Sequence, residues 1–186
     1  VVWRFDPLIL AGTLAQNPNA CDVLLERMAR IGRALQGYTR KLVFSFADIA
    51  DYRKVAENLR RAGLGWRDFT QDEMHAIAAG VARLSAEMGV EPCTCGERGD
   101  LSAFGISHNR CTDPELILTM TRRHPDILRL FDIAPQQLGL PLAMPSGANP
   151  ASQPHEYPRD PGQRAVCQCV PCKDVGQYDT CPHGCV

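Results

Sequence analysis

Short apolar runs alternate along this chain with segments of helical periodicity, and this alternation limits the possible folds more than any other feature. The run KLVFSF (residues 41–46) is apolar at nearly every position, as in a strand buried on both faces. The segments on either side of it carry apolar residues every three or four positions, the period of an amphipathic helix. Strands separated by helices pair in parallel through crossover connections. The alternation therefore predicts an α/β fold with parallel β/α units.

The expected elements follow in the order strand, helix, strand, helix, helix, strand, loop, helix. The Asp6–Pro7 pair is expected to end the first strand, and Thr70 and Glu73 form a capping-box pattern at the start of a helix. A sector of a (β/α) TIM-like barrel fits this order best, and an open doubly wound sheet is the alternative. The expected strands are residues 1–4, 41–46 and 90–95, and the expected helices are about residues 21–36, 51–63, 70–88 and 113–124.

The composition changes along the chain and predicts three regions. Residues 1–134 form the β/α domain, residues 135–164 are rich in Pro, Gly, Ser and Gln and form an irregular connector, and residues 165–186 form a cysteine-rich tail. The chain opens on a strand-like run without an initiator Met and stops one residue after Cys185. We therefore expect a fragment that is cut at both ends.

Composition and charge exclude several classes of protein. Of the 186 residues, 45% are hydrophobic and 22% are charged, which is ordinary for a globular protein. The net charge of −1 gives no support for nucleic-acid binding, and no apolar run is long enough for a membrane span. Partners are therefore expected among small-molecule or macromolecular substrates of unknown identity.

The cysteines are the strongest chemical signal in the sequence. There are nine, and they occur in close C-x-C, C-x-x-C and C-x-x-x-C spacings. Close spacing lets several sulfurs converge on one metal or cluster, whereas disulfide scaffolds are normally short secreted chains with little core. Metal or iron–sulfur ligation in a reducing cytoplasm is the favoured interpretation, with disulfides and incidental thiols as alternatives.

Several stretches resemble the domain-of-unknown-function family DUF1848. The resemblance is carried by VVWRFDPLIL at residues 1–10, SFADIADYRKV at 45–55, CGERGDLSAFGISHNRCTD at 95–113 and DVGQYDTCPHGC at 174–185. It spans nearly the whole chain, and the departures are the Pro-rich connector and Cys172, where the family more often shows a serine. The family has no assigned reaction, so the resemblance implies a fold and a set of cysteines rather than a substrate.

The family's terminal C-x-x-x-C-x-x-C resembles the cluster-binding loop of radical S-adenosylmethionine (SAM) enzymes. In such a loop three thiolates bind a [4Fe–4S] cluster and leave one iron open to SAM. Cys181 and Cys185 match the first two ligands, and the third would fall two residues beyond Val186. The resemblance thus implies one or two [4Fe–4S] clusters, SAM and an electron donor. Elsewhere it places cysteines at Cys95, Cys111, Cys167 and Cys169, which suit a closed site for a second cluster or, alternatively, zinc.

Polar residues just past the expected strands are the candidate catalytic groups. The carboxyl ends of parallel strands meet at one edge of a sheet, where substrates bind in β/α folds. The alternative is that these residues only cap turns or pair with neighbours. His108 and His183 lie beside cysteines and are candidates for groups that interact with the metal ligands without binding the metal. The candidates at the strand ends are Arg4, Asp6, Ser45, Asp48, Glu97 and Asp100, and the catalytic set is Arg4, Asp6, Asp48 and Glu97.

Two functions are compatible with these features. The first is an iron–sulfur protein with radical-SAM-like activity on an unknown substrate. The second is a zinc or iron–sulfur protein whose metal only stabilises a β/α scaffold that binds a partner. Metal content separates the two.

Overall fold

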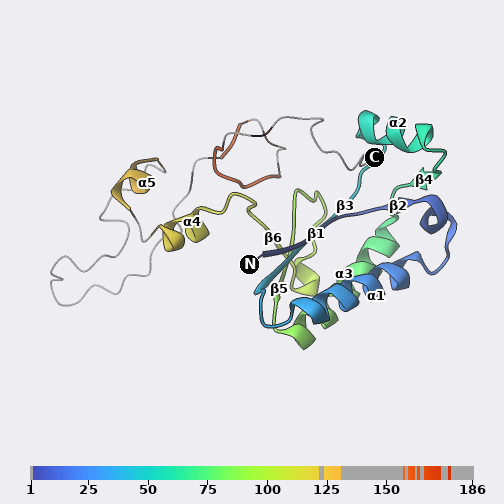
Figure 1. Ribbon diagram of the computed structural model, residues 1–186, viewed down its shortest axis with the longest axis horizontal. Coiled ribbons are helices and arrows are strands. Elements are labelled where there is room, and N and C mark those ends of the chain that lie inside the picture. Colours follow the sequence, from blue (N-terminus) through green and yellow to red (C-terminus); the bar gives the residue numbers. More distant parts are fainter. Residues whose placement is uncertain are drawn as a thin grey trace. The chain divides into compact units, whose positions relative to one another are not determined.

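The computed structural model describes residues 2–121, 124–130, 157, 159–161, 163, 166–172 and 176 (Figure 1). They belong to two compact units. Unit 1 comprises residues 1–109 and 175–186, and unit 2 comprises residues 110–174. Most of the predicted connector and the tail beyond Gly176 lie outside the described residues.

Unit 1 is built on a parallel sheet of four strands. These are β1 (Val2–Leu8), β3 (Lys41–Phe46), β5 (Glu91–Thr94) and β6 (Ser107–His108), and they lie in sequence order β1-β3-β5-β6. All three pairings are parallel. The predicted α/β fold with a parallel sheet is confirmed. The sheet is open, and the described residues form no closed barrel.

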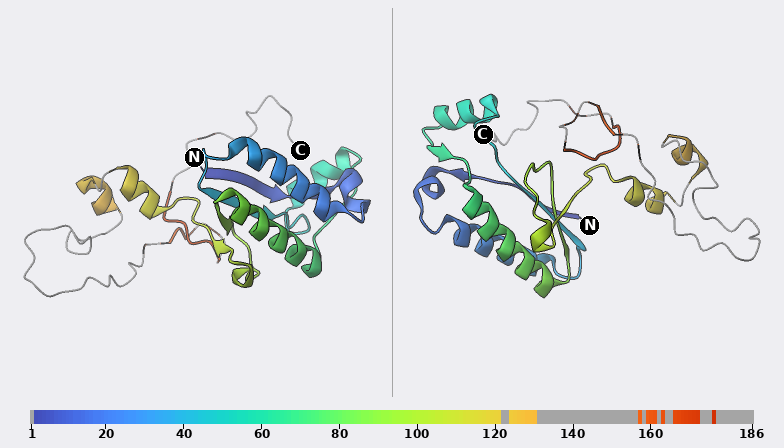
Figure 2. Two further views of the ribbon diagram at one scale, coloured as in Figure 1. Left: turned by 90° about the horizontal axis from the view of Figure 1, so that it is seen from below. Right: turned by 180° about the vertical axis from the view of Figure 1, so that it is seen from behind.

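Two helices, α1 (Ala20–Leu35) and α3 (Gln71–Met88), cover one face of this sheet side by side (Figure 2). The predicted capping box opens α3, because the Thr70 side chain accepts from the Glu73 N–H and the Glu73 carboxylate accepts from the Thr70 N–H. Gly89 ends the helix in the left-handed conformation with φ of 66°, which favours glycine. Local sequence therefore sets both ends of α3.

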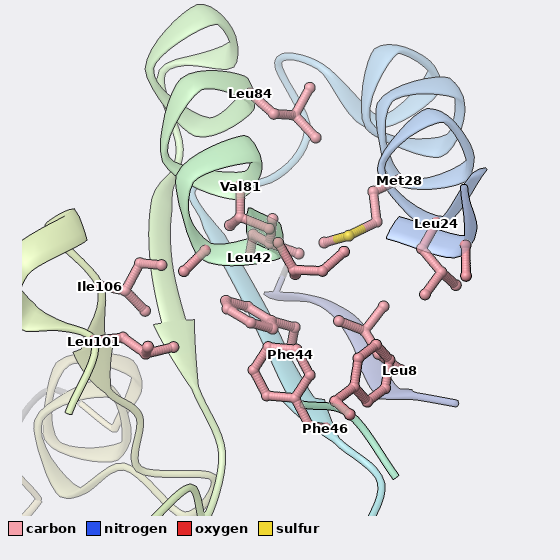
Figure 3. Packing of buried hydrophobic residues seen from close by; sticks show 14 of the residues in the cluster. Leu8, Leu24, Met28, Leu42, Phe44, Phe46, Val81, Leu84, Leu101 and Ile106 are labelled. Carbon is pink, nitrogen blue, oxygen red and sulfur yellow. The ribbon is translucent and has the colours of Figure 1, made fainter. Parts of the chain in front are cut away.

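The core lies between the helices and the sheet (Figure 3). Leu42 and Phe44 of β3 are fully buried among Met28 of α1 and Val81 of α3. Trp3 of β1 is 5% exposed and belongs to the same cluster. Burial of such large side chains stabilises the fold by about 1.5–3 kcal/mol each. The apolar face of the sheet and the two helices thus form one hydrophobic core.

Two glycines allow the helices to approach closely. A β-carbon on Gly80 of α3 would lie 2.3 Å from Cδ1 of Leu25 in α1. A β-carbon on Gly32 of α1 would lie 2.6 Å from the sulfur of Met88 in α3. Real β-carbons do not come this near to other atoms, so each helix uses a glycine where the other inserts a side chain.

The first strand is longer than predicted. We expected Asp6–Pro7 to end it, but β1 continues to Leu8. The ladder pairs Phe5 with Phe44 and then Leu8 with Phe46, so β1 has one extra residue at Asp6–Pro7. Such a bulge tolerates proline, which has no N–H to donate to a neighbouring strand. The Asp6–Pro7 peptide bond is cis.

The connection from β3 to β5 holds elements that the sequence did not all predict. The predicted second helix is α2 (Arg53–Arg61), of which only Leu59 is buried. After it, β4 (Trp66–Arg67) pairs antiparallel with β2 (Leu10–Ala11), and neither was predicted. A 3₁₀ turn, η1 (Gly12–Gln16), follows β2, and another, η2 (Ser102–Phe104), precedes β6.

Unit 2 contains α4 (Pro114–Met120) and α5 (Pro125–Leu130). Asp113 caps α4 through its carboxylate, as the sequence predicts. The helix ends at Met120 rather than near His124. Leu118, Leu128 and Val170 form a small apolar core. No helix among the described residues has the length and apolar character needed to cross a membrane.

Replacing Gly80 with Val is expected to lower the free energy of unfolding by about 1–3 kcal/mol, because the new side chain collides with Leu25. Ala76→Val is the control, since Ala76 is exposed on the same helix and the change costs less than about 0.7 kcal/mol through helix propensity. Urea unfolding followed by circular dichroism measures both. Equal stability of the two variants would contradict the close packing of α1 and α3.

Candidate functional site

The two faces of the sheet differ sharply in character. Neighbouring residues in register point to the same face, and successive residues of a strand point to opposite faces. Trp3 is in register with Leu42, and this row packs on α1 and α3. The next row on β1 and β3, which points away from the helices, begins with Arg4 and continues across the sheet to Ser107. This face therefore carries polar groups such as Arg4 and Ser107 beside the buried Val43 and Cys93.

A small polar network lies at the carboxyl end of β1 and β3 on this face. Ser45 Oγ donates to Asp6 Oδ1, and the Arg4 guanidinium donates to Asp6 Oδ2. Asp6 lies in the β1 bulge, and such bulges redirect a side chain. The structure thus brings together three of the residues that the sequence placed at this edge.

Glu97 is the most strongly perturbed carboxyl group of this edge. Its side chain follows β5, and the residue is only 8% exposed. Its Oε1 accepts the Phe46 N–H at 2.7 Å. Burial raises the pKa of Glu97 to about 7, the Phe46 N–H opposes this, and the negative charges of Asp48 and Asp6 add to it. A carboxyl group with this pKa exchanges a proton near neutral pH, which suits general acid–base chemistry.

Asp100 has a different role from the other candidates, because its side chain stabilises a turn. Its Oδ1 accepts the Ser102 N–H at 2.8 Å, and this hydrogen bond lowers the pKa of Asp100. The Asp100 side chain is exposed and organises the turn that leads to η2. Arg4, Asp6, Asp48 and Glu97 remain the predicted catalytic set, now with a common location at the carboxyl edge of the sheet.

Other polar residues of the same face were not predicted. Lys41 Nζ lies 3.5 Å from Asn109 Oδ1 and 3.9 Å from Glu91 Oε2. Cys93 is 1% exposed, and its sulfur lies 3.3 Å from Ser107 Oγ. Burial raises the pKa of Cys93, so this thiol stays neutral. No sequence pattern marked these rows, because Lys41–Phe46 is apolar at nearly every position, and only the strand register identifies them.

Three of the predicted metal-binding cysteines gather in unit 2. Cys169 is 6% exposed, and its sulfur accepts the N–H groups of Cys111 at 3.1 Å and Thr112 at 3.5 Å. Burial raises the pKa of Cys169 to about 11, against the two backbone hydrogen bonds, while a hydrogen bond with Cys167 and the charge of Cys111 raise it further. Backbone N–H groups directed at a sulfur stabilise a thiolate, the form that binds metal.

Of the remaining cysteines, the structure describes Cys95 and Cys21 but not the terminal pair. Cys95 lies in unit 1 just after β5, and its N–H donates to the Phe44 carbonyl at 2.9 Å. Its place in one site with the cysteines of unit 2 stays a prediction. Cys21 packs against the core, as expected of a small apolar residue. His108 Nδ1 lies 3.3 Å from Thr94 Oγ1. Cys181, Cys185 and His183 lie outside the described residues.

The described residues contain no group of three or more His, Cys, Asp or Glu side chains already arranged around a metal position. The three cysteines of unit 2 are therefore neighbours whose side chains would turn to meet an ion. The bonds between the metal and the sulfurs would supply the free energy for such a change, and the thiols would lose their protons as the ion binds.

Unit 1 is thus a mixed α/β structure with an open parallel sheet of four strands and helices packed on one face. The chain belongs to the family described as Domain of unknown function (DUF1848), whose family model matches residues 1–186. Comparisons with curated proteins and with solved structures gave no significant match.

Replacing Glu97 with Gln is expected to change how stability depends on pH. The folded pKa of about 7 lies above the ordinary value of 4.5, so the folded protein binds more protons than the unfolded chain between these values. Wild-type stability should then fall by about 3 kcal/mol as pH rises from 4.5 through 7, and Glu97→Gln should remove this loss while keeping an acceptor for the Phe46 N–H.

Thermal unfolding of both proteins across this pH range measures the effect. Glu87→Gln, at an exposed position of α3, controls for the introduction of an amide. A wild-type profile parallel to that of Glu97→Gln would mean that Glu97 is not the buried carboxyl group described above.

Proposed function

We propose that this protein is an iron–sulfur protein with radical-SAM-like activity on a substrate of unknown identity. The observation that carries the proposal is the gathering of Cys111, Cys167 and Cys169 in unit 2, with two backbone N–H groups on the Cys169 sulfur. The terminal Cys181 and Cys185, with the spacing described above, support a second cluster that binds SAM.

The donor set of unit 2 fits an iron–sulfur cluster. Cluster irons are held by cysteine thiolates, and hydrogen bonds to the sulfurs tune their potential. Burial raises the pKa of Cys169, and the positive charge of bound irons would favour its thiolate. A bound, reduced cluster would supply one electron for cleavage of a sulfonium such as SAM.

The carboxyl edge of the sheet is the part of unit 1 that we assign to substrate or SAM. Arg4 offers a cationic group, Asp6 is oriented by Ser45 and Arg4, and Glu97 holds a proton near neutral pH. Asp48 contributes negative charge beside Glu97. Together these groups can orient a polar ligand and move a proton. An electron donor is the partner that such chemistry requires.

We further propose that the sheet is a sector of a (β/α) barrel. Adjacent strands follow sequence order, and α1 and α3 lie on the same face, whereas a doubly wound sheet reverses its order and has helices on both faces. A cytoplasmic location is part of the proposal, supported by the lack of disulfide bonds among the seven described cysteines, since a reducing compartment preserves thiols.

A second candidate is a scaffold stabilised by zinc or an iron–sulfur cluster without catalysis. It is favoured by the position of the thiols, since the Val170 N–H donates to the Thr112 carbonyl at 3.3 Å beside Cys169 and Cys111. A metal at this place would join two distant stretches of unit 2 and stabilise them.

The full-length protein, purified without oxygen, is expected to be brown and to contain iron and sulfide for more than one cluster per chain. Cys169→Ser should lower both contents, because it removes the buried ligand, and Cys21→Ser should leave them unchanged, because Cys21 packs in the core. Iron, zinc and sulfide analysis with absorbance spectra measures this. Stoichiometric zinc without iron would reject the radical-SAM-like function and favour the scaffold.

The two cysteine sets should respond differently to mutation. Cys167→Ala with Cys169→Ala is expected to lower the melting temperature, because metal binding in a closed site contributes to folding. Cys181→Ala with Cys185→Ala should leave the melting temperature nearly unchanged and abolish the effect of SAM on the cluster spectrum. Reconstituted full-length variants, compared with and without SAM, test this. An undiminished SAM effect in the second variant would contradict the assignment of Cys181 and Cys185.

A further inference from the structure

The thiol group of unit 2 provides three ligands, and a closed thiolate site uses four. The described part of unit 2 contains one further cysteine, Cys172, which is exposed. It follows Cys169 by three positions, and this C-x-x-C spacing lets two sulfurs reach one metal. Exposure allows the Cys172 side chain to change rotamer without disturbing a core.

One residue, Asp160, contacts the segment at both of these cysteines. The Asp160 N–H donates to the Cys169 carbonyl at 3.0 Å, and the Cys172 sulfur lies 3.9 Å from Asp160 Oδ2. Residues 169 and 172 therefore both contact the same residue, Asp160.

The neighbouring stretches are joined by further hydrogen bonds. The Arg159 guanidinium donates to the Cys167 carbonyl at 2.8 and 3.1 Å. The Val170 N–H donates to the Thr112 carbonyl, next to Cys111. Val170 itself is fully buried against Leu118 and Leu128. The backbone that carries all four cysteines is thus held together within unit 2.

We infer that Cys172 is the fourth ligand of a metal site formed with Cys111, Cys167 and Cys169. The inference rests on the proposed function only in taking this thiol group as a metal site, and it assigns to Cys172 the role that the sequence predicted for Cys95. The site is then complete within one compact unit. Each thiol releases its proton to solvent as its sulfur binds the ion.

Anaerobic titration with Co²⁺ tests the inference without activity. Co²⁺ takes tetrahedral thiolate sites, and the intensity of its thiolate charge-transfer band rises with the number of bound sulfurs. The protein should carry Cys181→Ser and Cys185→Ser throughout, so that the terminal pair does not contribute. Cys172→Ser, Cys172→His and Cys95→Ser are compared in this background, with Cys21→Ser as the control for loss of a packed thiol.

Cys172→Ser is expected to lower the charge-transfer intensity per bound Co²⁺ by about a quarter and to weaken binding about tenfold or more. Cys172→His should show the same loss of intensity but keep tight binding, because imidazole also binds Co²⁺. Cys95→Ser should match the background protein in both quantities.

The inference is overturned if Cys95→Ser lowers the intensity, alone or together with Cys172→Ser, or if Cys172→Ser has no effect. Absence of tight Co²⁺ binding by the background protein also overturns it. Binding of Co²⁺ by four thiolates in a protein that contains no iron when isolated would uphold the inference and reject the iron–sulfur proposal, so the two failures are distinguishable.

Discussion

Trp3, Leu42 and Phe44 lie on one apolar face of the parallel sheet, and the packing of α1 and α3 on that face supports the rest of unit 1. The helices cover it together because Gly80 and Gly32 let them approach closely. With both helices on one face, the opposite face is left to the polar rows that begin at Arg4. The hydrophobic core and the polar groups around Arg4 therefore lie on opposite faces of one sheet.

The polar site depends on backbone geometry as much as on side-chain chemistry. The bulge in β1 adds one residue to the strand, and Asp6 lies within it, bonded to Ser45 on the neighbouring strand. Glu97 is held by a backbone N–H of β3 and not by a basic side chain. It is buried near two other carboxylates, and both conditions disfavour its negative charge, so Glu97 readily binds a proton. The edge therefore combines fixed positions with an exchangeable proton.

Unit 2 is stabilised differently, because its apolar core is small. Leu118, Leu128 and Val170 form its apolar cluster, and hydrogen bonds to the Cys169 sulfur and from the Val170 N–H add to it. A core of this size supplies little free energy, so a metal would make a large relative contribution to its stability. For this physical reason the proposals assign a structural role to the thiols of unit 2 and a catalytic role to Cys181 and Cys185.

The sequence by itself determined the local elements and the chemical types. KLVFSF predicts β3 at its observed bounds, and Thr70 with Glu73 predicts the start of α3, because apolar periodicity and capping act over a few residues. It also predicted the family and the grouping of polar residues at strand ends. The continuation of β1 past Asp6–Pro7, the pairing of β2 with β4 and the environment of Glu97 came only from the tertiary structure. Each depends on a partner far along the chain: Phe46 for β1, Trp66 and Arg67 for β2, and the Phe46 N–H for Glu97. Local propensity says that a residue suits a strand or a turn, but long-range hydrogen bonds and burial decide which strand it joins and which charge it carries.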